Sequence, residues 1–246
     1  RDRKISKPKL VVGVPSGITQ VEKKAVVDAC FQVGIKDVFL IEEPMAAAIG
    51  SDLPIEMPKG NMVVDIGGGT TEVAIISLSA TAYSESLRVA GSELDESIIR
   101  YLQKKYQVAI GYIAAEKIKI EAASVLPMED KGDPISIVGK DMFTGIPRNL
   151  KIPRDEIREA IEEPVSAIID SVKRALEKLP PEFVSDLHEA GMVLTGGGAM
   201  LKGLNKRIEA ETDIRVRVID DPLFSVVLGS GRAIEDMGRY KKVFIN

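Results

Sequence analysis

Two short glycine-rich segments contain the residues whose types and spacing could do chemistry. Gly67-Gly68-Gly69-Thr70-Thr71 comes shortly after the apolar run Met62–Asp65, and Gly196-Gly197-Gly198 follows Met192–Thr195. Glycine lets a ligand approach the backbone closely, and it tolerates positive φ. Successive amides of such a loop can point into one concavity and bind phosphate oxygens, to which the two threonines would add hydroxyl donors. The sequence therefore predicts two backbone cradles that face one phosphate-bearing ligand.

Acidic residues stand at the ends of two predicted strands. Asp65 comes just before the first glycine segment, where a carboxylate could hold Mg²⁺ directly or through water. Glu42 and Glu43 precede Pro44 at the start of a predicted helix. Acids at a helix N-terminus often only favour its dipole, by ~0.3–1 kcal/mol. At least one of the two glutamates is explained in this way. The other could orient a water against a terminal phosphate, because phosphoryl transfer depends on positioning and charge stabilisation.

Each of these patterns also has a purely structural interpretation. The first glycine segment could be a hairpin turn, and the second a tight strand-to-helix turn. Neither is a Walker A motif, since no Gly-Lys-Ser/Thr follows at the required spacing, and neither has the dinucleotide fingerprint. Glu116 and Lys119 are one helical turn apart, and their pattern alone favours a solvated charge pair.

Composition limits the class of protein. The 246 residues carry 37 acids and 33 bases, a net charge of −4, which argues against a protein that coats nucleic acid. A single cysteine, Cys30, allows no intrachain disulfide, and with the one histidine, His188, it excludes a zinc-finger type site. The cytosol is the expected compartment. No apolar run approaches the ~18–20 residues of a membrane span.

Hydrophobic periodicity predicts an α/β protein. Leu10–Val14 and Val38–Ile41 are expected strands, joined by a helix that a capping box at Thr19–Glu22 opens, which makes a parallel βαβ unit. Residues 127–153 change character and predict a small α+β insert. The other expected strands are Met62–Asp65 and Thr71–Leu78, which form a hairpin, Ile135–Val138, Leu150–Ile152, Met192–Thr195 and Val216–Ile219. The other expected helices are Met45–Ile49, Leu94–Tyr106, Ala114–Ala123, Asp155–Leu179, which Pro164 should bend or split, one from about Leu201, and a last one opened by Leu228.

Taken together, these segments resemble the actin-like ATPases, and closely the MreB family of bacterial rod-shape-determining proteins. The blocks Glu-Glu-Pro-Met-Ala-Ala-Ala and Asp-Ile-Gly-Gly-Gly-Thr-Thr-Glu are specific in combination. The matching stretches are Val11–Thr19, Leu40–Gly50, Met62–Val73, Arg88–Gly91, Glu116–Glu121 and Val193–Gly198.

The resemblance implies the actin-like, ribonuclease H-like ATPase fold. Residues 1–50 and 229–246 would form an incomplete first large subdomain. Residues 51–90 with 151–228 would form the second large subdomain, and 91–150 its small α+β insert. The family's first phosphate loop, Asp-x-Gly-Thr, does not occur here, so this sequence is expected to start partway into the fold.

The resemblance also implies roles for individual residues. Glu43 would position the attacking water, Thr70 would lie near the γ-phosphate, and Asp65 would serve Mg²⁺. The remaining residues would bind ATP: Gly67, Gly68, Gly69, Thr70 and Thr71 its phosphates, Glu116, Lys117 and Lys119 its ribose and adenine side, and Gly196, Gly197, Gly198, Ala199 and Met200 its adenosine.

The implied function is that of a cytoskeletal ATPase. Such a protein polymerises with itself, lies in the cytoplasm at the inner face of the cell membrane, and guides cell-wall synthesis with rod-complex membrane proteins. No nucleic acid partner is expected. Two departures are visible: only Ile5 is apolar in the loop before Pro8, where the family often has an apolar pair, and Ser92 stands where similar sequences usually carry aspartate.

Two other members of the superfamily remain possible interpretations. A sugar or metabolite kinase shares the phosphate loops, and a heat-shock chaperone ATPase domain shares the phosphate and adenosine loops. ATP-dependent sedimentation would separate them from a polymerising protein. Without the first phosphate loop, the 246-residue chain alone is expected to bind ATP poorly, to hydrolyse it negligibly and to self-associate through exposed strand edges.

Overall fold

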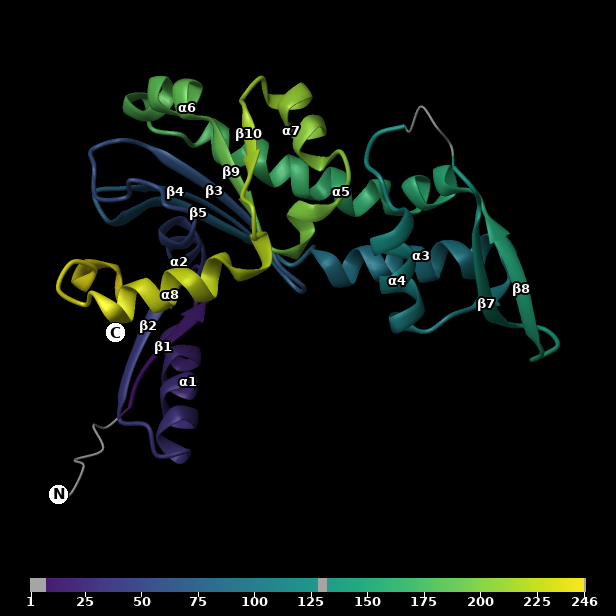
Figure 1. The fold of residues 1–246 in the computed structure, drawn as a ribbon, viewed down its shortest axis with the longest axis horizontal. Coiled ribbons are helices and arrows are strands. Elements are labelled where there is room, and N and C mark those ends of the chain that lie inside the picture. Colours follow the sequence, from purple (N-terminus) through teal and green to yellow (C-terminus); the bar gives the residue numbers. More distant parts are fainter. Residues whose placement is uncertain (1–7, 128–131, 246) are drawn as a thin grey trace.

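The computed structural model describes residues 8–127 and 132–245. Within these ranges the strands form a two-stranded, a five-stranded and a three-stranded sheet. Figure 1 shows the five-stranded sheet in the upper part of the molecule, with the two-stranded sheet below it and the three-stranded sheet at the far end of the longest axis. The central sheet therefore connects two outlying units.

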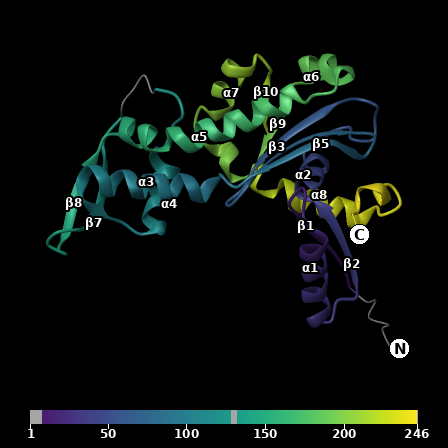
Figure 2. The same cartoon turned by 180° about the vertical axis from the view of Figure 1, so that it is seen from behind.

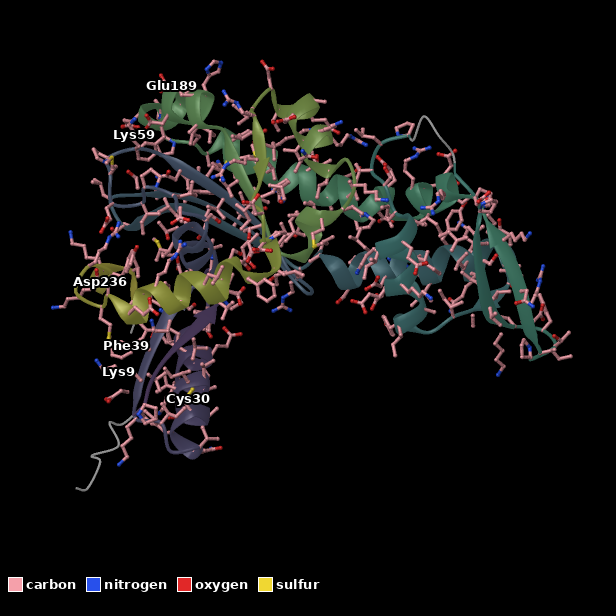
Figure 3. All side chains as sticks on the ribbon, viewed as in Figure 1. Lys9, Cys30, Phe39, Lys59, Glu189 and Asp236 are labelled. Atoms are coloured by element: carbon pink, nitrogen blue, oxygen red, sulfur yellow. The ribbon has the colours of Figure 1, made fainter. Side chains whose placement is uncertain are left out.

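The N-terminal unit is the predicted βαβ motif. Strands β1 (Lys9–Val14) and β2 (Asp37–Glu42) pair in parallel, and α1 (Gln20–Gln32) joins them. The expected capping box opens the helix, because the Thr19 hydroxyl accepts from the Glu22 amide at 3.2 Å while Glu22 Oε2 accepts from the Thr19 amide at 2.9 Å. Phe39, labelled on this unit in Figure 3, packs its ring 5.3 Å from that of Phe244. The C-terminal residues thus brace the unit.

The central sheet brings the glycine-rich segments to one edge. It consists of β3 (Asn61–Ile66), β4 (Thr71–Ser77), β5 (Ala80–Leu87), β9 (Met192–Thr195) and β10 (Val216–Val218), in the order β10-β9-β3-β4-β5. The predicted β3–β4 hairpin is confirmed, and β9 runs parallel to β3 with Thr195 beside Asp65. Strand β5 was not predicted, because small and polar residues replace the apolar run expected of a buried strand.

Helices cover both faces of this sheet. Figures 1 and 2 show α2 (Glu43–Gly50) and α8 (Ser225–Glu235) on one side, with α5 (Arg154–Glu177), α6 (Val184–Ala190) and α7 (Leu204–Thr212) on the other. Side chains alternate between the faces, so Val63 and Ala74 pack with α2 while Val64 and Val73 join the core beneath α5. The sheet is consequently buried on both sides.

Helices α2 and α8 cross with their backbones in close contact. A Cβ atom added at Gly50 would lie 2.0 Å from the carbonyl oxygen of Ser225, and one at Gly229 would lie 1.8 Å from that of Ala46. Arg232 further caps α2 by donating to the Ile49 carbonyl at 2.6 Å. The 3₁₀ turn η3 (Pro222–Phe224) leads directly into α8, which therefore starts at Ser225 and not at Leu228 as predicted.

The outlying lobe contains α3 (Gly91–Tyr106), α4 (Tyr112–Ala122) and the sheet of β6 (Val108–Ala109), β7 (Ile135–Asp141) and β8 (Pro147–Ile152). The Tyr106 hydroxyl donates to Glu156 of α5 at 2.7 Å and ties this lobe to the central sheet's helices. Helix α5 runs unbroken for 24 residues through Pro164, so of the predicted bend or split, the split does not occur. Pro164 is itself buried in the core, where packing holds the helix together.

The remaining turns of 3₁₀ helix are η1 (Pro181–Phe183), η2 (Gly197–Met200) and η4 (Lys241–Val243). The predicted helix after the second glycine segment begins with η2 and continues as α7. Ile5, the apolar residue of the loop before Pro8, lies outside the described residues. Over the described ranges, no helix has both the length and the apolar character needed to span a bilayer.

Candidate functional site

A cavity of about 750 Å³ lies where the two glycine loops meet the first turns of α2, α3 and α8 and one face of α4. Its size is that of a small-molecule or cofactor site. Most of the predicted site residues line it, although they come from four separate stretches of the chain. These are Glu43, Asp65, Gly67, Gly68, Gly69, Thr70, Glu116, Lys119, Gly196, Gly197, Gly198 and Met200.

Three predicted site residues lie elsewhere. Thr71 is fully buried in β4, where its hydroxyl donates to the Val89 carbonyl at 2.7 Å. Lys117 is exposed on α4 and pairs with Glu121 at 3.8 Å, because the helical period turns it away from the face that carries Glu116 and Lys119. Ala199 is buried in the core. The side chains of these three residues do not line the cavity.

The first glycine loop presents free backbone to the cavity. The Gly67 amide donates to the Thr70 carbonyl at 2.9 Å and closes the hairpin turn, and the carbonyls of Gly67 and Gly68 accept from the first amides of α3. No described residue accepts a hydrogen bond from the amides of Gly68 and Gly69. A Cβ atom at either position would meet nothing within 4 Å, and neither has positive φ. Packing within the protein therefore does not require glycine at these two positions.

The second glycine loop packs tightly against β3. Gly196 has φ of 78°, and a Cβ atom there would lie 2.4 Å from the Ile66 carbonyl oxygen and 2.5 Å from Asp65 Oδ1. At Gly198 it would lie 2.2 Å from Cγ2 of Ile66. The Gly196 amide also donates to the Pro222 carbonyl at 2.8 Å, which docks η3 on the loop. Here the fold itself requires glycine.

Acidic side chains gather beneath the first loop. Asp65 is only 6% exposed, and burial, followed by the charges of Glu43 and Glu72, raises its pKa to about 7. Burial, and then the charge of Glu72, also raises the pKa of Glu43. The charges acting on Asp65 are thus all negative, and a bound cation would relieve them.

This donor set fits a magnesium ion that is held mainly by its substrate. Mg²⁺ is usually bound through one or two carboxylates, several waters and the phosphate oxygens of a nucleotide. Asp65 supplies such a carboxylate at the cavity wall. The described residues contain no cluster of three or more histidine, cysteine or acidic side chains placed to hold a metal by themselves.

The cavity wall also contains a fixed ammonium group from α4. Lys119 Nζ donates to Asp95 Oδ2 at 2.9 Å and to the Gly91 carbonyl at 3.0 Å, and both charged side chains are largely buried. Burial raises the pKa of Asp95, against the opposing effect of Lys119. Because Asp95 neutralises it, Lys119 is suited to donate a directed hydrogen bond rather than to attract phosphate.

Several residues of the site were not predicted. Asp95 braces Lys119 from α3, and Glu72 lies buried under the first loop. The contacts of each come from distant parts of the chain, so no local pattern shows its role. Apolar side chains of Leu94, Ile120 and Leu223 complete the wall. They are far apart in sequence and carry no motif, so only the folded chain brings them together.

Solved structures of actin-like proteins match this arrangement. The crystal structure of MreB 5 of Spiroplasma citri bound to AMPPNP superposes with a TM-score of 0.90 at 31% identity, covering 96% of this chain and 71% of that one. The same protein bound to ADP gives a TM-score of 0.89. The MamK double helical filament gives 0.78 at 22% identity, over 92% of this chain and 68% of that one, and shows the fold alone.

Sequence comparison gives the same result. The cell shape-determining protein MreB of Escherichia coli (strain K12) is 48% identical over 228 residues, which cover 93% of this chain and 65% of that relative. The cell shape-determining protein Mbl of Bacillus subtilis (strain 168) is 41% identical over 237 residues, which cover 96% of this chain and 71% of the relative. The chain therefore spans 65% of the length of its Escherichia coli relative. The profile of the MreB/Mbl protein family matches residues 1–242, and we conclude that this chain belongs to that family of actin-like proteins.

Proposed function

We propose that the protein binds and hydrolyses ATP with Mg²⁺ and assembles into cytoskeletal filaments that determine cell shape. The observation that carries the nucleotide site is the first glycine loop, in which Gly68 and Gly69 line the cavity and their amides have no acceptor among the described residues. Amides in such a loop form a nest for phosphate oxygens. The AMPPNP and ADP bound by the Spiroplasma citri relative support the identity of the ligand.

The acids provide positioning for the reaction. Glu43 lies at the first turn of α2 and at the cavity wall, where its carboxyl group can accept a proton from a water and hold that water against the terminal phosphate. Burial keeps the pKa of Glu43 above its ordinary value, which suits a group that accepts a proton. Thr70, at the end of the loop, adds a hydroxyl group near the same phosphate.

Asp65 would hold Mg²⁺ from the end of β3, directly or through water. When bound, Mg²⁺ neutralises charge on the phosphate oxygens. Binding of the ion would also favour the ionised form of Asp65, whose burial among acids otherwise opposes ionisation. Asp65 would therefore be ionised more readily when Mg²⁺ and phosphate occupy the cradle than when the cradle is empty.

The nucleoside would occupy the other end of the cavity. Lys119 and Glu116 present polar groups from α4, while Met200 and the backbone of Gly197 and Gly198 come from the opposite side. Free amides of the second loop and the apolar wall suit the edge and face of a purine. This end of the cavity gives affinity and orientation rather than chemistry.

The remaining parts of the proposal concern the whole protein. Membership of the MreB/Mbl family, with cell shape-determining relatives, supports assembly into a cytoskeletal polymer. We place the protein in the cytoplasm at the inner face of the membrane, with cell-wall synthesis and rod-complex proteins as partners and no nucleic acid partner. We keep the division into a first large subdomain (1–50 and 229–246), a second (51–90 and 151–228) and an insert (91–150).

Replacing Gly68 by alanine tests the nucleotide site. The methyl group has room in the protein, so thermal stability should stay unchanged, while the affinity for Mg-ATP should fall about 10-fold or more because the methyl group occupies the phosphate position. Isothermal titration calorimetry on the whole natural protein measures the affinity. Gly231→Ala is the matched control, since its added Cβ also meets nothing within 4 Å but lies in α8 away from the cradle. Equal affinity in both variants would disprove this phosphate cradle.

Sedimentation with and without ATP tests the filament. The whole natural protein should pellet with Mg-ATP and stay in the supernatant without it. A kinase or a chaperone ATPase domain would stay in the supernatant under both conditions, and that result would refute the filament proposal while leaving the nucleotide site intact.

A further inference from the structure

A row of buried polar residues crosses the central sheet at its glycine-loop edge. The strand registers place Thr195 beside Asp65, Asp65 beside Glu72 and Glu72 beside Ser86, from β9 through β3 and β4 to β5. Residues paired in this way project from the same face of a sheet. This face is the one that α2 covers, because Val63, two residues before Asp65, and its partner Ala74, two residues after Glu72, pack with α2. The row therefore lies on the side from which Glu43 enters the cavity.

Glu72 is the member of this row that reaches a different unit of the molecule. It is 1% exposed, and both of its carboxylate oxygens are used. Oε1 accepts from the Ser86 hydroxyl at 2.6 Å within the sheet, and Oε2 accepts from the backbone amide of Ser16 at 3.1 Å. Ser16 belongs to the turn that joins β1 to α1 in the N-terminal unit. A charge-assisted bond of this kind is among the stronger hydrogen bonds in proteins.

The turn at Ser16 is held through its backbone amide, which donates to Glu72. Ser16 is buried, and its hydroxyl oxygen has no hydrogen-bond partner among the residues that the structure describes. A second polar contact lies nearby, where the Thr81 hydroxyl of β5 donates to Glu42 Oε2 at 2.8 Å. Carboxylates thus join the N-terminal unit to the β4–β5 edge from both sides: Glu72 from the sheet and Glu42 from the unit.

The same turn adjoins the backbone that supports Glu43. Val14, the last residue of β1, pairs with Glu42, and a Cβ atom added at Gly13 would lie 3.4 Å from Cγ of Glu43. The Glu43 side chain therefore rests on the end of β1. A shift of the turn that follows β1 would shift the surface on which Glu43 rests.

We propose that Glu72 is a positioning residue of the site, which clamps the β1–α1 turn through the Ser16 amide and so fixes Glu43 relative to the phosphate cradle. The clamp itself is independent of any ligand, whereas its consequence for hydrolysis rests on the proposed function. Glu72 does not itself line the cavity, although it lies beside Asp65, and the proposed route of its action is the backbone of the N-terminal unit. It also completes the set of acids around Asp65 while two hydrogen bonds hold its own carboxylate in place.

Glu72→Asp is the decisive variant, because it keeps the charge and shortens the side chain by one methylene. We expect the shorter aspartate side chain to lose the hydrogen bond to the Ser16 amide, because its carboxylate is drawn back toward β4. We expect hydrogen exchange at the Ser16 amide of the whole natural protein to accelerate about 10-fold or more, with exchange in β9 unchanged. Ser77→Ala, which removes a buried hydroxyl from the other end of β4, is the matched control and should leave exchange at Ser16 unchanged. Unaltered exchange at Ser16 in Glu72→Asp would overturn the clamp.

Glu72→Gln separates length from charge, and it keeps the test open if the aspartate variant does not fold. Glutamine retains an acceptor oxygen at the original reach, so exchange at Ser16 should rise less than in Glu72→Asp. The reverse order would mean that charge alone matters and would overturn the proposal.

In the whole natural protein, Glu72→Asp should lower kcat for ATP hydrolysis about 10-fold while leaving the Kd for Mg-ATP unchanged, because the cradle is intact. A changed Kd for Mg-ATP in Glu72→Asp, with normal exchange at Ser16, would also overturn the proposed clamp. A wild-type protein that binds no nucleotide would refute the proposed function, and the exchange measurement would still decide the clamp.

Discussion

The two glycine loops share their composition and lie at the ends of neighbouring strands, but they need glycine for different reasons. In the second loop, Gly196 has positive φ, and a side chain there or at Gly198 would collide with Ile66. In the first loop, Gly68 and Gly69 have ordinary φ and open space around them. Packing within the protein therefore explains the glycines of the second loop, whereas we attribute those of the first loop to the proposed binding of phosphate. The same motif can thus meet a packing requirement in one loop and a binding requirement in the other. Glycine-to-alanine substitutions distinguish the two.

Gly196→Ala should have the largest effect, and it probes the structural side of this comparison. The variant combines a strained backbone with a contact of 2.4 Å to the Ile66 carbonyl oxygen. We expect the free energy of unfolding to drop by about 3 kcal/mol or more. Thermal unfolding followed by circular dichroism, beside Gly68→Ala, measures it. Equal melting temperatures in the two variants would remove the distinction between the loops.

Glu43→Ala probes the chemistry next to the first loop. Losing one positioned group typically slows a reaction by ~10²–10³, so ATP hydrolysis by the whole natural protein should fall by that factor while nucleotide still binds. A phosphate-release assay, with calorimetry for binding, checks both quantities. Turnover at the wild-type rate would reduce Glu43 to a residue that favours the dipole of α2.

Asp65→Asn tests the residue that touches both loops. The unfolded carboxyl group ionises near its ordinary pKa and the folded one near 7, so between these values the folded state binds more protons and stability falls as pH rises. The variant lacks this loss. Its stability relative to wild type should therefore increase from pH 4 to pH 7 by up to about 4 kcal/mol, then level off. Urea titrations across this range measure the difference, and a constant difference would contradict the raised pKa.

Lys117→Ala should have the smallest effect. Lys117 is exposed and turned away from both loops, so its loss should leave affinity for Mg-ATP unchanged. Lys119→Ala, on the face of α4 that lines the cavity, removes the ammonium group held by Asp95 and should weaken binding of Mg-ATP about 10-fold. Calorimetry on the two variants measures both affinities. Equal affinities would show that the cavity-lining lysine has no special role in binding.

The fold was predictable where periodicity is strong. The capping box at Thr19, the β3–β4 hairpin and the parallel βαβ unit follow from local patterns, and each is confirmed. Strand β5 was missed because its partners, not its own side chains, make it a strand. The predicted split of α5 at Pro164 does not occur for the opposite reason. A residue that locally disfavours helix is buried in the core, and tertiary packing keeps α5 continuous across it.

The site was predictable where one short segment supplies several groups. Both glycine loops and Asp65 could be identified because their residues are consecutive. Lys117 was included only because it lies between Glu116 and Lys119, and the helical period separates it from them. Asp95 and Glu72 depend on contacts across 24 and 56 residues of sequence, which no local pattern encodes.

The crossing of α2 and α8 has a consequence for how the two ends of the cavity communicate. Gly50 and Gly229 bring the two backbones into contact, so neither helix can slide without moving the other. One helix begins at Glu43, and the other begins at η3, which is docked on the second glycine loop. The pair therefore forms one mechanical unit that links the second glycine loop to Glu43. If nucleotide binds as proposed, we expect a displacement of η3 to be passed to Glu43 through the two backbones.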